Sequence, residues 1–159
     1  MGQKSFAIWL KCMIAGVCVC LLAVYGMVIP IFALNVRAVY PEFSYCFWPW
    51  LIFLWITALP CYGALGLGWR ITSNIGRDRS FCDENARLLK VISFLAAGDA
   101  AYFFAGNIVL LLLNMNHPGI ALGLLLVVFA GAAVAAAAAA LSHLVKKAAV
   151  LQEQSDLTI

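Results

Sequence analysis

The chain has 159 residues, of which 65% are hydrophobic and only 11% are charged, whereas soluble domains carry about 25% charged residues. Together with a mean hydropathy of +1.00, this composition excludes a water-soluble globular domain, and the length leaves no room for an appended globular module. The net charge of +3 suits attraction to anionic lipid in the bilayer, so no direct binding of nucleic acid is expected.

Four apolar runs predict four transmembrane helices, because each is longer than the ~20 residues that cross a ~30 Å hydrocarbon layer. The runs cover residues 12–34, 46–69, 91–114 and 119–145. A polar loop at 70–90 separates the second run from the third, and a tail at 146–159 follows the fourth. The expected fold is an all-α membrane protein, a single domain over residues 1–159 with its four transmembrane helices in one bundle.

The basic residues predict the topology, since nine of the ten Lys and Arg residues fall on one side of the membrane once the spans are drawn. The nine are Lys4, Lys11, Arg70, Arg77, Arg79, Arg87, Lys90, Lys146 and Lys147. Short loops rich in Lys and Arg stay in the cytoplasm. Both termini and the loop at 70–90 are therefore expected to be cytoplasmic, and only Arg37 is expected outside.

The first two spans each contain a proline, which removes an intrahelical hydrogen bond. Pro30 predicts a kink or an early helix end near the outer end of the first span, and Pro60 favours a bend near the middle of the second. Cys12, Cys18, Cys20 and Cys61 also lie in these spans, and Cys46 begins the second one. Since only Cys46 approaches the oxidising side, no disulfide is expected, and we interpret the cysteines as small packing residues.

The second half of the polar loop predicts an early start for the third helix. Ser80 and Asp83 have the spacing of a capping box, which would begin a helix near Phe81. Asp83 and Arg87 would then lie four residues apart on one helix face. Such an amphipathic extension is usually a solvated or headgroup-facing surface, and a protein-docking surface is the sharper alternative.

The third span holds the one acidic residue inside a span, Asp99. A carboxylate at a helix centre costs about 2.5–3.5 kcal/mol on insertion, so it should face other helices, pair with another group or be protonated. Asp99, Tyr102 and Asn107 lie on one side of this helix and form a candidate intramembrane polar site. The functional interpretation is a proton or cation site. The structural alternative is a carboxyl group hydrogen-bonded to Tyr62, Thr57 or a backbone carbonyl.

The fourth span is rich in small residues, which allow helices to approach closely. Gly119 and Gly123 have the G-x-x-x-G spacing, and an unbroken run of alanines follows at Ala135–Ala140. These residues predict backbone-to-backbone packing within the bundle or against another copy, so a homo-oligomer through this face is one expectation. The helical period continues past Lys146 and Lys147, so the helix is expected to leave the membrane intact.

No constellation in the sequence assembles a catalyst. The chain has no His/Cys/Asp cluster at metal-ligand spacing, no nucleophile elbow and no glycine-rich phosphate loop. We therefore expect no catalytic residues, no cofactor, no bound metal and no enzymatic activity.

Two segments on the predicted cytoplasmic side carry a resemblance to a known family. The first follows the pattern Phe-x-x-x-Asn-x-x-x-Leu-[basic]-x-Ile at Phe81, Asn85, Leu89, Lys90 and Ile92. The second follows Glu-x-x-Asp-Leu-Thr-Ile at Glu153, Asp156, Leu157, Thr158 and Ile159, with Gln154-Ser155 where the family more often has Glu-Asn. In these segments the chain resembles the YoaS-type family of small bacterial membrane proteins.

The resemblance implies a four-span protein of the bacterial cytoplasmic membrane, with an uncharacterised domain over nearly the whole chain and no assigned activity. Members are often encoded beside a very small helix-turn-helix regulator, which implies a membrane protein that holds or tunes a transcription factor. The residues that carry the resemblance lie outside the predicted spans, on the basic side.

Two hypotheses of function follow. The first is a non-enzymatic regulatory or docking protein that binds a cytoplasmic protein partner, such as a small helix-turn-helix regulator. The expected contact residues are Phe81, Asn85, Arg87, Leu89 and the Asp156–Ile159 tail. The second is a small oligomeric transporter or channel subunit that uses Asp99 as a proton or cation site. A purely structural partner of a larger membrane complex is a third possibility.

Overall fold

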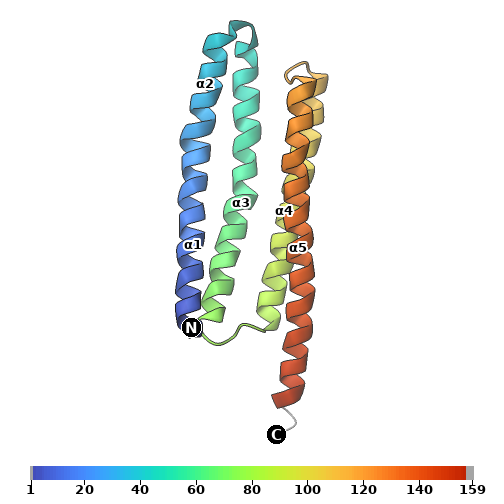
Figure 1. Ribbon diagram of the computed structural model, residues 1–159. Coiled ribbons are helices and arrows are strands. Elements are labelled where there is room, and N and C mark those ends of the chain that lie inside the picture. Colours follow the sequence, from blue (N-terminus) through green and yellow to red (C-terminus); the bar gives the residue numbers. More distant parts are fainter. Residues whose placement is uncertain (1, 157–159) are drawn as a thin grey trace.

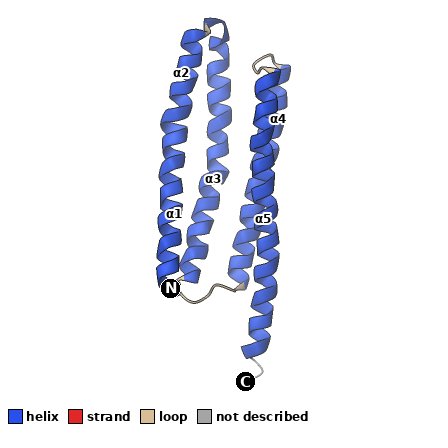
Figure 2. Ribbon diagram, in the orientation of Figure 1, coloured by secondary structure: helices blue, strands red, loops and turns tan. Residues whose placement is uncertain are grey.

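The computed structural model describes residues 2–156, and these residues form helices joined by short connections (Figure 2). In chain order the elements are α1 (Gln3–Ala23), a π-helical turn η1 (Val24–Val28), α2 (Ile29–Val39), a 3-10 segment η2 (Pro41–Cys46), α3 (Phe47–Ile75), α4 (Asp83–Leu112) and α5 (Pro118–Asp156). Four helical stretches are long and apolar enough to cross a membrane. The all-helical class and the four spans are thus confirmed.

The first span runs past Pro30 and ends only at Val39, so the early helix end predicted there does not occur. The irregularity lies one turn earlier, in η1. A proline supplies no N–H to the preceding turn, and the wider π turn rearranges the carbonyls that this leaves. One of them, the Tyr25 carbonyl, accepts a hydrogen bond of 3.1 Å from the Trp55 indole on α3.

The four spanning helices pack in a row (Figure 1). Within the described residues, α1 contacts α3, α3 contacts α4 and α4 contacts α5, whereas α1 and α5 do not contact each other. The expected bundle is therefore open on one side. Lipid tails are as apolar as the helix surfaces, so no hydrophobic force closes such a row.

The α4–α5 pair packs through the small residues that the sequence indicated. A Cβ on Gly131 would lie 3.1 Å from the Cβ of Ala100, and Ala135 is buried. The Ser93 hydroxyl donates a 2.8 Å hydrogen bond to the Ala135 carbonyl. Part of the alanine run is thus used inside the chain, while Gly123 has open space beside it.

Aromatic rings join α3 to α4 towards the end of the molecule that holds the α4–α5 turn. The Phe53 ring stacks on Phe103 with centroids 5.4 Å apart and lies 5.2 Å from the Tyr102 ring. Gly106 makes room for Phe53, because a Cβ there would collide with the ring. The Trp50 indole also donates a 2.7 Å hydrogen bond to the Met115 carbonyl in the α4–α5 turn. The α3–α4 contact is thus held by a small core of large side chains.

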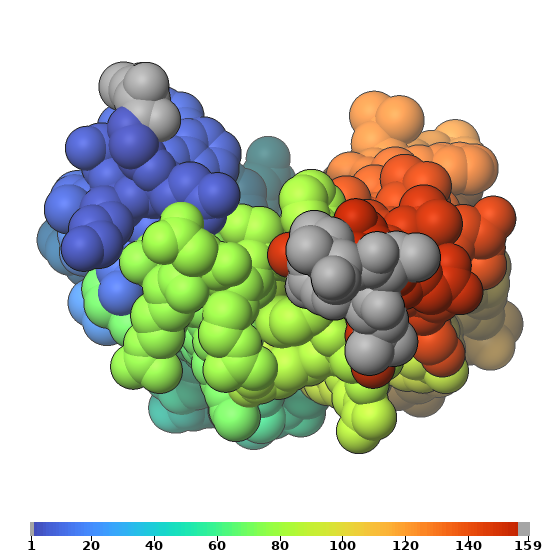
Figure 3. Space-filling view, turned by 90° about the horizontal axis from the view of Figure 1, so that it is seen from below, coloured from blue at the N-terminus to red at the C-terminus, as the bar shows by residue number. Residues whose placement is uncertain are grey.

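One end of the molecule gathers the start of α1, the end of α3, the start of α4 and the end of α5 (Figure 1). We call it the basic end, because it includes Lys4, Arg77, Arg79, Arg87 and Lys147. Here α1 packs closely on α3, since a Cβ on Gly76 would lie 3.2 Å from the Cβ of Ala7. Figure 3 looks onto this end, with α1 and α5 on opposite sides of the end of α3 and its loop.

Candidate functional site

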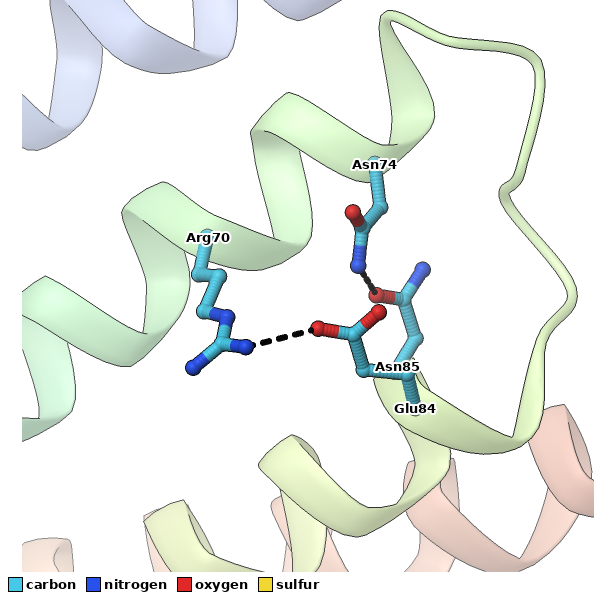
Figure 4. Close-up of polar contacts among 4 residues, drawn as sticks. All are labelled: Arg70, Asn74, Glu84 and Asn85. Atoms are coloured by element: carbon cyan, nitrogen blue, oxygen red, sulfur yellow. Dashed lines mark hydrogen bonds and ion pairs between the residues drawn. The ribbon is translucent and has the colours of Figure 1, made fainter.

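Asn85 organises the loop at the basic end. Its side chain is only 1% exposed. Its Oδ1 accepts a 2.8 Å hydrogen bond from the Asn74 amide, and its Nδ2 donates to the carbonyls of Arg79 at 3.1 Å and Ser80 at 3.0 Å. Figure 4 shows the asparagine pair bridging α3 and α4. The loop between these helices is therefore fixed from the inside.

This arrangement changes how the family pattern around Asn85 is understood. The sequence suggested Asn85 as a residue that contacts a partner, but its donors and acceptor are already engaged within the chain. A buried amide that loses its partners costs about 1–3 kcal/mol. Asn85 therefore holds the loop in its conformation from inside the protein and is not exposed on the surface.

The start of α4 also differs from the prediction. The helix begins at Asp83 with Cys82 as its N-cap residue, and no side chain makes a capping hydrogen bond there. The predicted capping box of Ser80 and Asp83 does not form. The physical reason is that the Ser80 carbonyl accepts a hydrogen bond from the Asn85 side chain. This bond, and not a bond of the Ser80 hydroxyl to the first turn of α4, ties the loop to the helix.

Two ion pairs flank the loop. Arg70 on α3 lies 3.2 Å from Glu84 on α4 (Figure 4), and Arg87 lies 2.6 Å from Asp83, one turn away on the same helix. The second pair has the four-residue spacing expected from the sequence. The Arg87 side chain is 81% exposed, so a partner can reach it. Exposed pairs of this kind contribute about 0–1 kcal/mol each.

An apolar hollow of about 500 Å³ lies beside the loop. All four spanning helices contribute to its wall, which includes Phe6, Ile71, Phe81, Leu89 and Val145. Phe81 is 56% exposed although it belongs to a polar loop outside the apolar spans. The structure thus brings two of the expected contact residues, Phe81 and Leu89, to one concave surface.

Only the start of the tail can be compared with this hollow. The helix α5 continues to Asp156, about 16 Å beyond Val145 at 1.5 Å per residue. The Asp156 side chain and Leu157, Thr158 and Ile159 lie outside the described residues. The part of the contact surface expected on the tail is therefore not joined to the loop by any described contact.

The intramembrane polar site has a partner that the sequence did not indicate. The nearest polar partner of Asp99 is the Cys61 thiol, with Sγ 3.9 Å from Oδ2. The expected hydrogen bonds from Asp99 to Thr57 or Tyr62 do not form in the described structure, since the Thr57 hydroxyl bonds to Tyr25 at 2.8 Å and donates to the Leu54 carbonyl at 2.7 Å. Cys61 was interpreted as a packing residue because a thiol in an apolar span carries no other signal.

Tyr102 and Asn107 do not join Asp99 in one network. The Tyr102 hydroxyl donates to the Phe53 carbonyl at 3.4 Å. Asn107 is buried nearer the α4–α5 turn, where its Oδ1 accepts a 2.9 Å hydrogen bond from the Asn116 amide. The predicted polar stripe is therefore divided among three separate sets of contacts.

The described residues hold no group of three or more His, Cys, Asp or Glu side chains that could bind a metal ion. Their polar groups include the loop network at the basic end, the Asp99 region inside the spans and the Asn107–Asn116 pair near the α4–α5 turn.

Comparisons with known proteins agree with this picture of a small membrane protein. The chain is 29% identical to the "Uncharacterized membrane protein YoaS" of Bacillus subtilis (strain 168), over 99% of both chains. No solved structure matches the chain. Residues 31–159 match the family described as "Protein of unknown function (DUF2975)". The resemblance to the YoaS-type proteins is confirmed, and the chain is a membrane protein that belongs to the DUF2975 family.

Proposed function

We propose that the chain is a non-enzymatic membrane protein that docks a cytoplasmic protein partner at its basic end. The proposal places both termini and this end in the cytoplasm, because nine of the ten Lys and Arg residues belong to that side. A small helix-turn-helix regulator is the kind of partner that the resemblance implied. The observation that carries the proposal is the half-exposed Phe81 beside an apolar hollow.

Phe81 supplies an anchor for such a partner. Burying a phenylalanine side chain that was exposed to water stabilises a complex by about 1.5–3 kcal/mol, and interface energy is usually concentrated in a few aromatic or arginine residues. Arg77 and Arg79 make no ion pair within the described residues, so this loop offers positive charge around the apolar centre. An acidic surface with one apolar side chain would complement it.

The test is recovery of the partner with the tagged protein from its native membrane, compared between two phenylalanine variants. Phe81→Ala should lower the recovered amount at least about tenfold, which corresponds to about 1.4 kcal/mol. Phe129→Ala is the matched control, because Phe129 is 71% exposed on the apolar span of α5. Equal recovery with both variants would contradict the proposal.

The tail is tested separately. Removal of Asp156–Ile159 should also release the partner if this short segment adds a strand or fills a groove on it. If truncation leaves the bound fraction unchanged while Phe81→Ala lowers it, docking uses the loop and not the tail.

The transport alternative receives less support from the geometry. Asp99 has the Cys61 thiol beside it, but an apolar core of Phe53, Phe103 and Leu110 fills the interface on its outer side. A proton or cation path needs polar groups or water along its length. We therefore retain docking as the proposed function.

A further inference from the structure

The longest helix, α5, leaves most of its surface uncovered. Within the described residues it contacts only α4, and the side that faces α4 carries the buried Ala135, whose carbonyl accepts the hydrogen bond from Ser93. Two apolar stripes run along the rest of the helix. One of them carries the bulky side chains of Leu122, Leu126 and Phe129, which are between 68% and 74% exposed. Side chains of this kind suit contact with lipid tails.

The other stripe has a pattern that repeats every seven residues. Its β-branched residues are Ile120, Val127 and Val134, and they alternate with the small residues Gly123, Ala130 and Ala137. All six are exposed, and Gly123 has open space beside it. The steps of three and four residues place them on one helix face, as in a coiled coil. Small residues between β-branched ones allow a second helix to approach closely.

This stripe stays apolar beyond the span. With the same steps of three and four residues it continues through Leu141, Leu144, Ala148 and Leu151. Leu144 and Leu151 are 61% and 66% exposed, although Lys146 and Lys147 follow the apolar run. The bulky stripe, continued in the same way, reaches His143 and Lys147 instead. Only one of the two stripes therefore needs an apolar partner where lipid tails end.

No described helix of the same chain covers this end of the stripe. The Ser142 hydroxyl donates a 2.6 Å hydrogen bond to the Ala86 carbonyl, and α4 begins only three residues before Ala86, at Asp83. Since α4 and α5 run in opposite directions, α5 passes the start of α4 near Val145. Its end extends beyond the other helices (Figure 1). Leucines exposed in such a position are typical of an interaction surface.

We propose that this stripe, which we call the α5 seam, pairs with the α5 seam of a second copy in a parallel two-helix coil. Two copies in one membrane have the same orientation, so a two-fold axis along the membrane normal places each seam residue opposite its counterpart. β-branched residues at alternate core positions favour two strands. Lys147 and Gln152 flank the seam on its two sides, so a parallel pair brings Lys near Gln and no like charges meet.

The second copy also borders the hollow at the basic end, because Leu141 belongs both to the seam and to the wall of the hollow. The two hollows then lie at the same end of the dimer. The inference does not depend on docking of a cytoplasmic partner, since the purified protein alone should form the pair.

The test counts copies of the fluorescently labelled full-length protein in phosphatidylcholine vesicles by single-molecule photobleaching, over a range of protein-to-lipid ratios. The unmodified protein should form dimers that dissociate on dilution in lipid. Ala137→Leu should raise the dissociation constant at least about tenfold, because a larger side chain overpacks the seam. Ala136→Leu is the matched control and should leave the constant unchanged, since Ala136 is also exposed but lies outside the seam.

A second pair of variants tests the seam beyond the span. Leu151→Lys should weaken the dimer about tenfold, because it removes an apolar contact, whereas Val150→Lys, at a position that is 47% exposed outside the seam, should not. A monomer at every protein-to-lipid ratio would overturn the proposal, and that measurement needs no variant. Dimers that respond equally to the seam variants and to their controls would overturn it as well, because the copies would then pair through another face.

Discussion

Asn85 and Asp99 lie on the same side of α4, about four helical turns apart, and the chain treats them in opposite ways. Asn85 is buried and bonded to a side chain of α3 and to two carbonyls of the loop. Asp99, deeper in the span, has a thiol 3.9 Å away. Asn85 lies at the end of the molecule, where the backbone carbonyls of a loop can accept its hydrogen bonds. Asp99 lies near the middle, where the backbone groups are already hydrogen-bonded within the helices.

The difference distinguishes two roles that a polar residue can have in a membrane protein. A polar side chain whose partners all lie in the same chain stabilises the fold, as Asn85 does. A polar side chain with weak partners adds little to the fold, and its presence then calls for another explanation. The following variants measure this distinction.

The largest effect is expected from Asn85→Leu. The substitution leaves the Asn74 amide and the Arg79 and Ser80 carbonyls without their partner, so it should lower the free energy of unfolding by about 1–3 kcal/mol. Thermal unfolding in detergent measures it. Asn35→Leu is the control, because Asn35 is exposed on α2. Equal stability of the two variants would show that the loop network contributes nothing.

A second measurement couples Asn85 to Asn74. The two amides share a 2.8 Å hydrogen bond, so their alanine variants should not be additive, with an interaction energy of about 0.5–3 kcal/mol in a double-mutant cycle. Pairing Asn85→Ala with Asn35→Ala gives the reference value, which should be close to zero. Additivity within error for both pairs would argue against the bridge between α3 and α4.

A smaller effect is expected from Glu84→Gln, which removes the ion pair with Arg70. Both side chains are well exposed, at 36% and 67%, so solvent screens the attraction and the loss of stability should be about 0.2–1 kcal/mol. Repeating the unfolding at high salt should bring the variant and the unmodified protein together. A larger loss that persists in salt would make this pair part of the structural core of the basic end.

Asp99→Asn should have the smallest effect on unfolding. The carboxylate contacts only a thiol at 3.9 Å among the described polar groups, so the change should stay below about 1 kcal/mol. The variant keeps the size of the side chain and removes its charge. If it destabilises the protein as strongly as Asn85→Leu does, the contrast between the two residues is wrong.

The same variant tests transport. Reconstituted vesicles with the unmodified protein, with Asp99→Asn and without protein should show equal proton flux under an imposed pH gradient, because the aromatic core of Phe53 and Phe103 closes the α3–α4 interface. A flux that requires Asp99 would instead support the transporter or channel subunit.

Sequence patterns sufficed for the four spans, since length and hydropathy are local properties of the chain. They also placed Asp99 inside a span, but they did not predict its contact with Cys61. They did not suffice for Asn85, whose role depends on an amide in another helix and on loop carbonyls that only the folded loop brings near. The capping box predicted at Ser80 also failed, because the Asn85 side chain binds the Ser80 carbonyl instead. Cys61 and Tyr25 were missed for a related reason, since apolar spans make a thiol or a phenol look like packing.

The π turn at Val24–Val28 has a consequence for how the first span could have changed in evolution. Such a turn behaves as a helix with one additional residue, and one residue of an α-helix spans about 100° of rotation. A chain without that residue would still cross the membrane. Every side chain beyond the turn would, however, be rotated by about 100° around the helix axis relative to α1. Arg37, which now lies 5.6 Å from the centre of the Phe47 ring, would be carried away from it. The turn thus acts as a fixed rotation between two halves of one span.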